Sequence, residues 1–470
     1  MHGAILVRHI SATGAHMSQT IHPVDEVLPF GQMLAVGIQH VLVMYAGAIA
    51  VPLIIGAALK LPKDQVAFLI SSDLFACGIV TLVQCIGVWK FGIRLPVIMG
   101  VSFAPVGPMV AMASSGAGLP AIFGATIAAG VFAIVIAPFF GRLMRFFPPI
   151  VTGTIILTIG MTLFPVAIYW AGGGRGAPHF GDPRNLMIAS IVLLAILLIN
   201  KYLRGFIANI SVLLGMAIGF AIALPLGLID FSGIGRAAWF APVRPFAFGM
   251  PTFDFAAIAS LCLVMVVIMV ESLGMFLALG DLAMRPVSRA DATRGLRTDG
   301  LGTVIGGIFN TFPHSSFSQN IGLVGITGVK SRWVVAVSGV ILMLLGLLPK
   351  LSNLIASIPV VVLGGAGIAM FGMVAATGVK ILSKVDFESK NNLLIVAISL
   401  GVGVIPLTAP TFFSQMPAWA GPLTHSGITL TAVVAILLNA LFNRGRPTDD
   451  VQREIAADMP LSLRQGDDNA

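Results

Sequence analysis

Long apolar segments follow one another along the chain and are separated by short polar loops. A spanning helix needs about 20 consecutive apolar residues, and at that length the pattern predicts fourteen transmembrane segments. A membrane-spanning strand would alternate in polarity instead, so the pattern favours an all-α polytopic membrane protein. The predicted segments lie near residues 32–59, 66–89, 94–113, 117–140, 147–170, 185–203, 206–229, 254–280, 298–312, 313–329, 332–348, 355–379, 391–413 and 424–443.

Composition supports this class and excludes others. The chain is 57% hydrophobic and 10% charged, with a mean hydropathy of +0.99, whereas soluble domains carry about 25% charged residues. The net charge of +8 does not indicate nucleic-acid binding, because the basic residues are dispersed among short loops. The three cysteines lie in apolar segments without the spacing of metal ligands. We therefore expect no metal and no cofactor.

Basic residues divide unequally between the two sets of loops. With fourteen spans both tails lie on one side, and that side receives twenty of the 27 Lys and Arg residues. Cytoplasmic loops carry such an excess. We therefore expect residues 1–30 and 444–470 to be cytoplasmic tails of a protein of the inner cell membrane.

Two predicted spans are interrupted, at residues 95–108 and 313–322, by Pro, Gly, Ser and Asn. A bilayer tolerates irregular backbone only where protein or a water-filled cavity satisfies its polar groups. The two stretches also resemble each other, with Ser102-Phe103-Ala104 in the first and residues 316–318 in the second. Matched interruptions in two halves are typical of an inverted-repeat transporter site, although a three-residue echo also arises by chance.

Charged residues inside spans are costly and usually functional. Glu271 follows an apolar run and no Lys or Arg lies inside any predicted span, so we expect a functional role. Asp299 lies close to a predicted span boundary, where a helix cap is the alternative. His40 is interpreted either as a site residue or as a packing histidine, and Asp73 as a site residue or a polar helix contact. We expect His314, at a span end, to be solvated.

Gln319 and Asn320 occupy the second interruption. A glutamine amide presents a donor and an acceptor side by side, which complements the adjacent C=O and N–H of a lactam ring. Glu271 can accept two further N–H groups, and Phe103 offers a face for stacking. Together these residues predict a site for a flat heterocycle.

The stretch Gln319–Gly322, followed after four residues by Thr327-Gly328, resembles the signature of the nucleobase–ascorbate transporters, also called the nucleobase:cation symporter-2 family. Gln39-His40 resembles the paired Gln-His motif of the family, and Glu271 and Asp299 lie where it keeps two acidic residues. The resemblance covers residues 30–445.

Within the family, residues 39–47 and 310–314 are most similar to the bacterial uric acid and xanthine permease branch. Gly328 departs from the Arg that uric acid members tend to carry, and some xanthine carriers have Gly there. Preference between uric acid and xanthine therefore stays open.

The resemblance implies a 7+7 inverted repeat with a core and a gate domain, in which spans 3 and 10 are broken by short extended segments. The core would comprise residues 31–140 and 251–349, with spans 1–4 and 8–11. The gate would comprise residues 141–250 and 350–443, with spans 5–7 and 12–14. It further implies a homodimer that transports by an elevator-type movement of core against gate.

The resemblance also assigns roles to individual residues. Those expected to bind the purine are Glu271, Gln319, Phe103, Ser318 and Ala104. Those expected to hold the core and the proton path are Asp299, His40 and Asn320. Those expected to influence selectivity are Ser102, Thr327, Gly328 and Ser426.

The expected function is proton-coupled uptake of xanthine or uric acid, with the purine, the proton, the lipid bilayer and a second copy of the chain as partners. Carriers of uracil, guanine or hypoxanthine remain alternatives within the same fold. A passive channel would need a continuous polar pore. An anion carrier would need a basic residue near the interruptions. The predicted spans contain no nucleophile–base pair, so the sequence does not indicate an enzyme.

Overall fold

The computed structural model describes residues 22–417 and 420–443. The predicted C-terminal tail and most of the N-terminal tail lie outside these residues. The first half of the chain forms α1 Phe30–Ala58, α2 Lys63–Ile86, β1 Met99–Val101, α3 Val106–Ser114, α4 Leu119–Ile136, α5 Phe140–Leu143, α6 Pro149–Ala171, α7 Pro183–Tyr202, α8 Phe206–Asn209, α9 Ser211–Ala223 and α10 Ser232–Arg236.

The second half repeats this pattern of long helices around one interrupted segment. It forms α11 Phe255–Leu282, α12 Arg289–Ile308, β2 His314–Ser316, α13 Gln319–Thr327, α14 Arg332–Gly346, α15 Pro349–Ala356, α16 Val360–Leu382, α17 Lys390–Thr408, α18 Gly421–Thr424 and α19 Gly427–Phe442. Short 3-10 turns flank α5.

Eight helices in the described ranges are long and apolar enough to cross a membrane, and a ninth results if α14 and α15, which are bent by 80°, form one span. The other predicted segments are short, broken or charged helices, so the total of fourteen spans stays a prediction.

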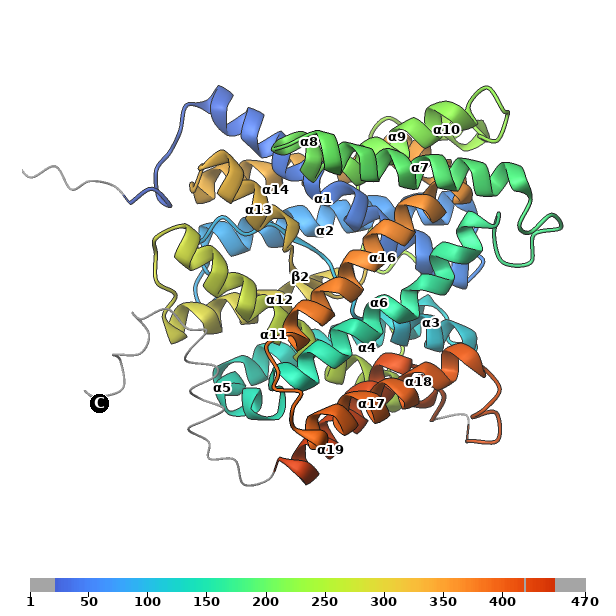
Figure 1. The fold of residues 1–470 in the computed structure, drawn as a ribbon. Coiled ribbons are helices and arrows are strands. Elements are labelled where there is room, and N and C mark those ends of the chain that lie inside the picture. Colours follow the sequence, from blue (N-terminus) through green and yellow to red (C-terminus); the bar gives the residue numbers. More distant parts are fainter. Residues whose placement is uncertain (1–21, 418–419, 444–470) are drawn as a thin grey trace, which may run out of the picture.

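Both predicted interruptions are present. β1 and β2 pair antiparallel, with Met99 opposite Ser316 and Val101 opposite His314, and a short helix follows each strand. Figure 1 shows β2 near the middle of the molecule, among the long helices. Because the strands satisfy each other's backbone groups, the chain can leave helical structure at this depth.

The most extensive helix contacts join the two halves of the chain: α6 with α16, α2 with α14, and α4 with α12. Two of these crossings are made by pairs of glycines. A Cβ on Gly130 would lie 2.7 Å from the Gly300 oxygen, and one on Gly78 would lie 2.5 Å from the Gly339 oxygen. Small residues let helix backbones approach this closely in membranes.

The helix that carries Asp299 begins earlier than the apolar pattern predicts. α12 begins at Arg289, not near residue 298, and Ser288 and Asp291 form a capping box at its start. Asp299 therefore lies in the middle of a helix. The alternative of Asp299 as a helix cap is wrong.

We expect Gly130→Leu to destabilise the protein by about 1–3 kcal/mol, because the new side chain meets backbone atoms of α12 that cannot rearrange. The thermal midpoint of purified protein in detergent measures this. Gly401→Leu, whose added carbon meets nothing within 4 Å, is the control. Equal thermal midpoints for both variants would show that the α4–α12 crossing can accommodate a leucine side chain without loss of stability.

Candidate functional site

The paired strands meet two long helices at the centre of the structure. α11 packs against β2 and α13, and α12 packs against β2. The Ser102 N–H donates to the Pro313 oxygen at 2.9 Å, and the Phe317 N–H donates to the Ile98 oxygen at 3.0 Å. These bonds extend the pairing just before α3 and α13 begin. The two half-helices thus start from opposite ends of one short ladder, and their positive ends favour polar or anionic groups.

His40 and Asn320 tie α1 to α13. The Asn320 amide donates to the His40 carbonyl oxygen at 2.9 Å and lies 3.0 Å from its Nδ1. Both side chains are buried, with exposed fractions of 1% and 2%. His40 Nε2 and Asn320 Oδ1 have no hydrogen-bond partner within the described structure. The pair fixes the start of α13 and leaves two polar atoms for a further partner.

Glu271 on α11 and Asp299 on α12 are near neighbours. Asp299 is fully buried, and neither carboxyl oxygen has a hydrogen-bond partner among the described residues. The Ser272 and Ser316 hydroxyls lie close to it but outside hydrogen-bonding geometry, and Glu271 interacts with it electrostatically. No Lys or Arg in the described part forms an ion pair with either carboxyl group. Two neighbouring acidic side chains therefore lie in the interior without a basic partner among the described residues.

The residues expected to touch a ligand are more open than the residues of the expected proton path. Ser318 and Gln319 are exposed at the start of α13, and the Ser318 hydroxyl lies 3.3 Å from Gln319 Oε1. Phe103 and Glu271 are half-buried. Ala104 is buried. No hydrogen bond in the described residues joins Glu271 to Gln319.

Phe103 also faces a helix of the other predicted domain. Its ring meets the Phe371 ring of α16 edge to face, with the centroids 5.9 Å apart. Edge-to-face is one of the preferred arrangements of an aromatic pair.

Of the four residues expected to influence selectivity, only Ser102 lies beside the ladder, where its Oγ accepts from the Ala104 N–H at 3.3 Å. Thr327 donates to the Leu323 oxygen, and Gly328, with φ at +67°, ends α13. The length of α13 places Thr327 and Gly328 about 12 Å from Gln319. A direct effect on the same ligand would therefore need the ligand to extend along α13.

Ser426 forms part of a hydroxyl chain between two helices. Its Oγ caps α19 and lies 2.8 Å from Thr429 Oγ1, which in turn lies 2.9 Å from Ser260 Oγ of α11. All three hydroxyls are buried. The sequence points to Ser426, but the pairing with Ser260 has no local signal because 169 residues separate Ser260 from Thr429.

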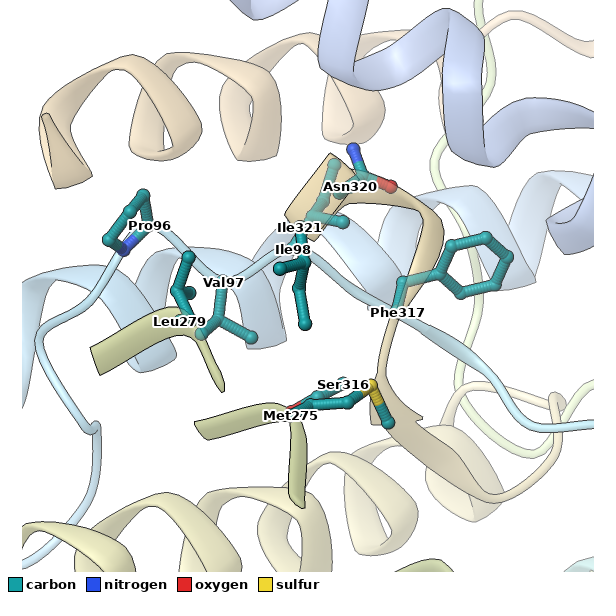
Figure 2. Close-up of a pocket in the computed structure, with 9 residues that line it drawn as sticks. All are labelled: Pro96, Val97, Ile98, Met275, Leu279, Ser316, Phe317, Asn320 and Ile321. Atoms are coloured by element: carbon teal, nitrogen blue, oxygen red, sulfur yellow. The ribbon is translucent and has the colours of Figure 1, made fainter. Parts of the chain in front are cut away.

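A small cavity lies beside the ladder (Figure 2). It has a volume of about 10 Å³ and is lined by the stretch 96–98, Met275 and Leu279 of α11, and residues 316, 317, 320 and 321. This volume holds about one water molecule. Met275 lies one helical turn beyond Glu271, so the cavity adjoins the acidic pair but does not accommodate a purine.

Sequence reasoning missed a second polar cluster, formed by Asp73, Cys77, Thr311 and His314. Thr311 donates to Asp73 Oδ1 at 2.7 Å, and Cys77 Sγ lies 3.7 Å from Asp73 Oδ2 and 3.4 Å from His314 Nε2. The expectation of a solvated His314 is wrong, because its exposed fraction is 0%. The available signal is the i, i+4 spacing of Asp73 and Cys77 on one helix face.

Asp73, Cys77 and His314 are also residue types that bind metals, and their ligand atoms lie within 4.8 Å of one another. However, each group already has a protein partner, since the other ring nitrogen of His314 lies 2.8 Å from the Phe312 oxygen. The cluster is therefore satisfied as a hydrogen-bonded link between α2 and residues 311–314.

Comparison with known proteins gives consistent matches over nearly the whole chain. A family model named Xan_ur_permease and described as "Permease family" matches residues 31–412. The uric acid transporter UacT of Escherichia coli is 53% identical over 94% of this chain and 92% of that protein. The xanthine permease of Bacillus subtilis is 45% identical over 90% of this chain and 97% of that protein. The uric acid permease PucK of Bacillus subtilis is also 45% identical, over 88% and 96%.

Solved structures similar to this chain share its fold at low identity. The transmembrane domain of the cyanobacterial bicarbonate transporter BicA gives a TM-score of 0.55 at 15% identity, covering 88% of this chain and 98% of that one. Murine Slc26a9, an anion transporter in the inward-facing state, also gives 0.55 at 15% identity, covering 93% and 73%.

We expect Thr311→Val to destabilise the protein by about 1–3 kcal/mol, because the Asp73 carboxyl group loses its closest donor in a buried site. Thermal unfolding in detergent measures this. Thr377→Val is the matched control, since that exposed hydroxyl donates only within its own helix. If the two variants unfold at the same temperature, the cluster does not stabilise the fold.

Proposed function

The chain belongs to this permease family, and from that premise we propose that it is a secondary transporter that takes up xanthine or uric acid together with a proton. It is a multi-pass membrane transport protein and not an enzyme. The observation that carries the proposal is the Glu271 carboxyl group on α11, which is half-buried and lies next to the buried Asp299, whose carboxyl oxygens have no hydrogen-bond partner among the described residues.

The proposed ligand is held by its edge and its face. Glu271 accepts N–H groups of the purine, and the Gln319 amide pairs with a neighbouring C=O and N–H. Phe103 stacks on the ring, while Ser318 and Ala104 complete the pocket through their backbone. Exposure of Ser318 and Gln319 and the half-burial of Phe103 and Glu271 support this assignment. None of these five proposed binding residues is basic, which favours a heterocycle recognised through hydrogen bonds and stacking over an inorganic anion.

Asp299 and Glu271 together are proposed to take up the proton. A bare carboxylate in an apolar setting is costly, and two adjacent ones without a cation raise that cost further. Protonation at this pair would neutralise the site before the loaded core moves. His40 and Asn320 would hold α13 in register with α1 during that step.

The proposed domains follow the seven-span repeat. Numbered this way, α2 and α14 are spans 2 and 11, and α4 and α12 are spans 4 and 9. In a 7+7 repeat, span 2 corresponds to span 9 and span 11 corresponds to span 4, so the two contacting pairs are equivalent. The α6–α16 contact joins spans 5 and 12, which correspond to each other. The first two contacts fall inside the proposed core and the third inside the proposed gate.

We further propose that the protein works as a homodimer in the inner membrane, with both tails cytoplasmic, and that the core moves against the gate. Two contacts between the proposed domains are made by side chains, the Ser260–Thr429 hydrogen bond and the Phe103–Phe371 ring contact. Both can break without unfolding a helix.

Glu271→Gln should lower uptake of labelled xanthine and uric acid at least about tenfold, because a hydrogen bond to a charged group is worth about 1.5–3 kcal/mol. Uptake into cells, normalised to the amount of protein in the membrane, measures this. Glu388→Gln makes the same change on an exposed loop and should leave uptake unchanged. Parental uptake by Glu271→Gln would remove Glu271 from the site.

Accumulation in vesicles should collapse when a protonophore is added and should persist when sodium is removed. This result follows from the proposal that the Glu271–Asp299 pair takes up a proton and not a sodium ion. A requirement for sodium would contradict proton coupling while leaving the ligand assignment intact.

A disulfide between Ser260→Cys and Thr429→Cys should stop uptake, because it would bind the proposed core to the proposed gate. The parent oxygens lie 2.9 Å apart, within reach of a disulfide. Oxidation should abolish uptake in the double variant, and reduction should restore it. Oxidation should not change uptake by either single variant. Full uptake by the cross-linked protein would show that these helices do not separate during transport.

A further inference from the structure

An open basic pocket of about 530 Å³ lies at the Arg289 end of α12. Four cationic side chains line it, Lys90, Arg289, Arg294 and Arg297, and its lining contains no acidic residue. The acidic group nearest to them in sequence, Asp291, lies 3.8 Å from Arg294 and accepts from the Ser288 hydroxyl at 2.6 Å. The pocket is therefore strongly positive, because four basic side chains face only one nearby carboxylate, and that carboxylate already accepts a hydrogen bond from Ser288.

Buried hydrogen bonds hold this pocket in shape. The Gly92 N–H donates to Thr298 Oγ1 at 2.6 Å, and the Gln84 amide donates to the Gly295 oxygen at 3.3 Å. The Ile93 N–H donates to Gln84 Oε1 at 3.1 Å. The loop that carries Lys90 is therefore fixed to the helix that carries the three arginines, and a ligand finds the cations already assembled.

The same loop exposes an aromatic side chain beside the charges. Trp89 is 77% exposed, and its backbone adopts a φ of +49°. Val88 is 56% exposed, and the Lys90 ammonium lies 5.1 Å from the Trp89 ring. An exposed tryptophan is unfavourable in water. It is favourable at a membrane interface, because tryptophan is enriched at the level of the lipid headgroups.

The position of the Trp89–Lys90 loop after α2 indicates its depth in the membrane. Trp89 and Lys90 follow the last residue of α2, Ile86, which ends a 24-residue apolar helix long enough to span. The loop therefore lies at the boundary between acyl chains and water. A ligand at this depth meets guanidinium groups on one side and an indole on the other.

We propose that this pocket binds the phosphate headgroup of an anionic phospholipid from the adjacent leaflet. Arginine pairs with phosphate through two parallel N–H donors, and Trp89 and Val88 contact the first acyl carbons. Because Arg297 and Thr298 directly precede Asp299, the bound lipid steadies the helix that carries the buried carboxyl group. Binding at this pocket is independent of the transported substrate.

Native mass spectrometry of the purified full chain, titrated with phosphatidylglycerol or phosphatidylethanolamine, tests the proposal. Phosphatidylglycerol should bind at least about tenfold more tightly than phosphatidylethanolamine, and the Lys90→Gln/Arg289→Gln/Arg294→Gln variant should lose that difference. The control variant Lys201→Gln/Arg204→Gln/Lys380→Gln removes the same charge from exposed positions elsewhere and should keep it. Equal binding by the pocket variant and the parent overturns the proposal.

Two further measurements distinguish the source of the phosphate and avoid dependence on a triple variant. Excess inorganic phosphate should not displace phosphatidylglycerol, and displacement would show that the pocket recognises a soluble anion instead. In nanodiscs, phosphatidylglycerol brominated near the headgroup should quench a component of the tryptophan fluorescence that Trp89→Phe removes. Identical quenching of the parent and Trp89→Phe also overturns the proposal.

Discussion

A backbone N–H or C=O inside a bilayer must find its partner within the protein, and the β1–β2 pairing meets this requirement where two spans are interrupted. Three residues from each half of the chain satisfy one another, so neither interruption is tolerable without the other. The pairing lets α3 and α13 leave from the two ends of one short ladder. It thereby sets Phe103 just beyond one end of the ladder and Gln319 just beyond the other, although 216 positions separate them in the sequence.

Asp73 and Asp299 are both buried, but they differ in their hydrogen-bond partners. Asp73 accepts from Thr311 and lies beside Cys77 and His314, so its cluster is satisfied and links secondary elements. Asp299 has the same burial and residue type, but its oxygens have no hydrogen-bond partner in the described structure. An unsatisfied carboxyl group next to half-open Glu271 costs stability. The proton path proposed for Asp299 would give that cost a function.

The elements that the sequence predicts well are those with local signals. Apolar length located the long helices, and Pro and Gly located both interruptions. The start of α12 was missed because its first turns carry Arg289, Arg294 and Arg297, which an apolar-window test excludes although the helix continues through them. Burial of His314 depends on Asp73 and Cys77, more than 230 positions away, and the Ser260–Thr429 bond joins residues 169 positions apart. Such partners are decided by packing, which no local pattern encodes.

The glycine crossings divide the molecule into stiff and compliant parts. At Gly78 with Gly339 and at Gly130 with Gly300, backbone rests on backbone, so no rotamer change can absorb a displacement. The contacts at Ser260 and Phe103 are made by side chains instead. If the proposed core moves against the proposed gate, we expect the helices joined by glycine crossings to move as units, and the side-chain contacts to be the ones that break and re-form.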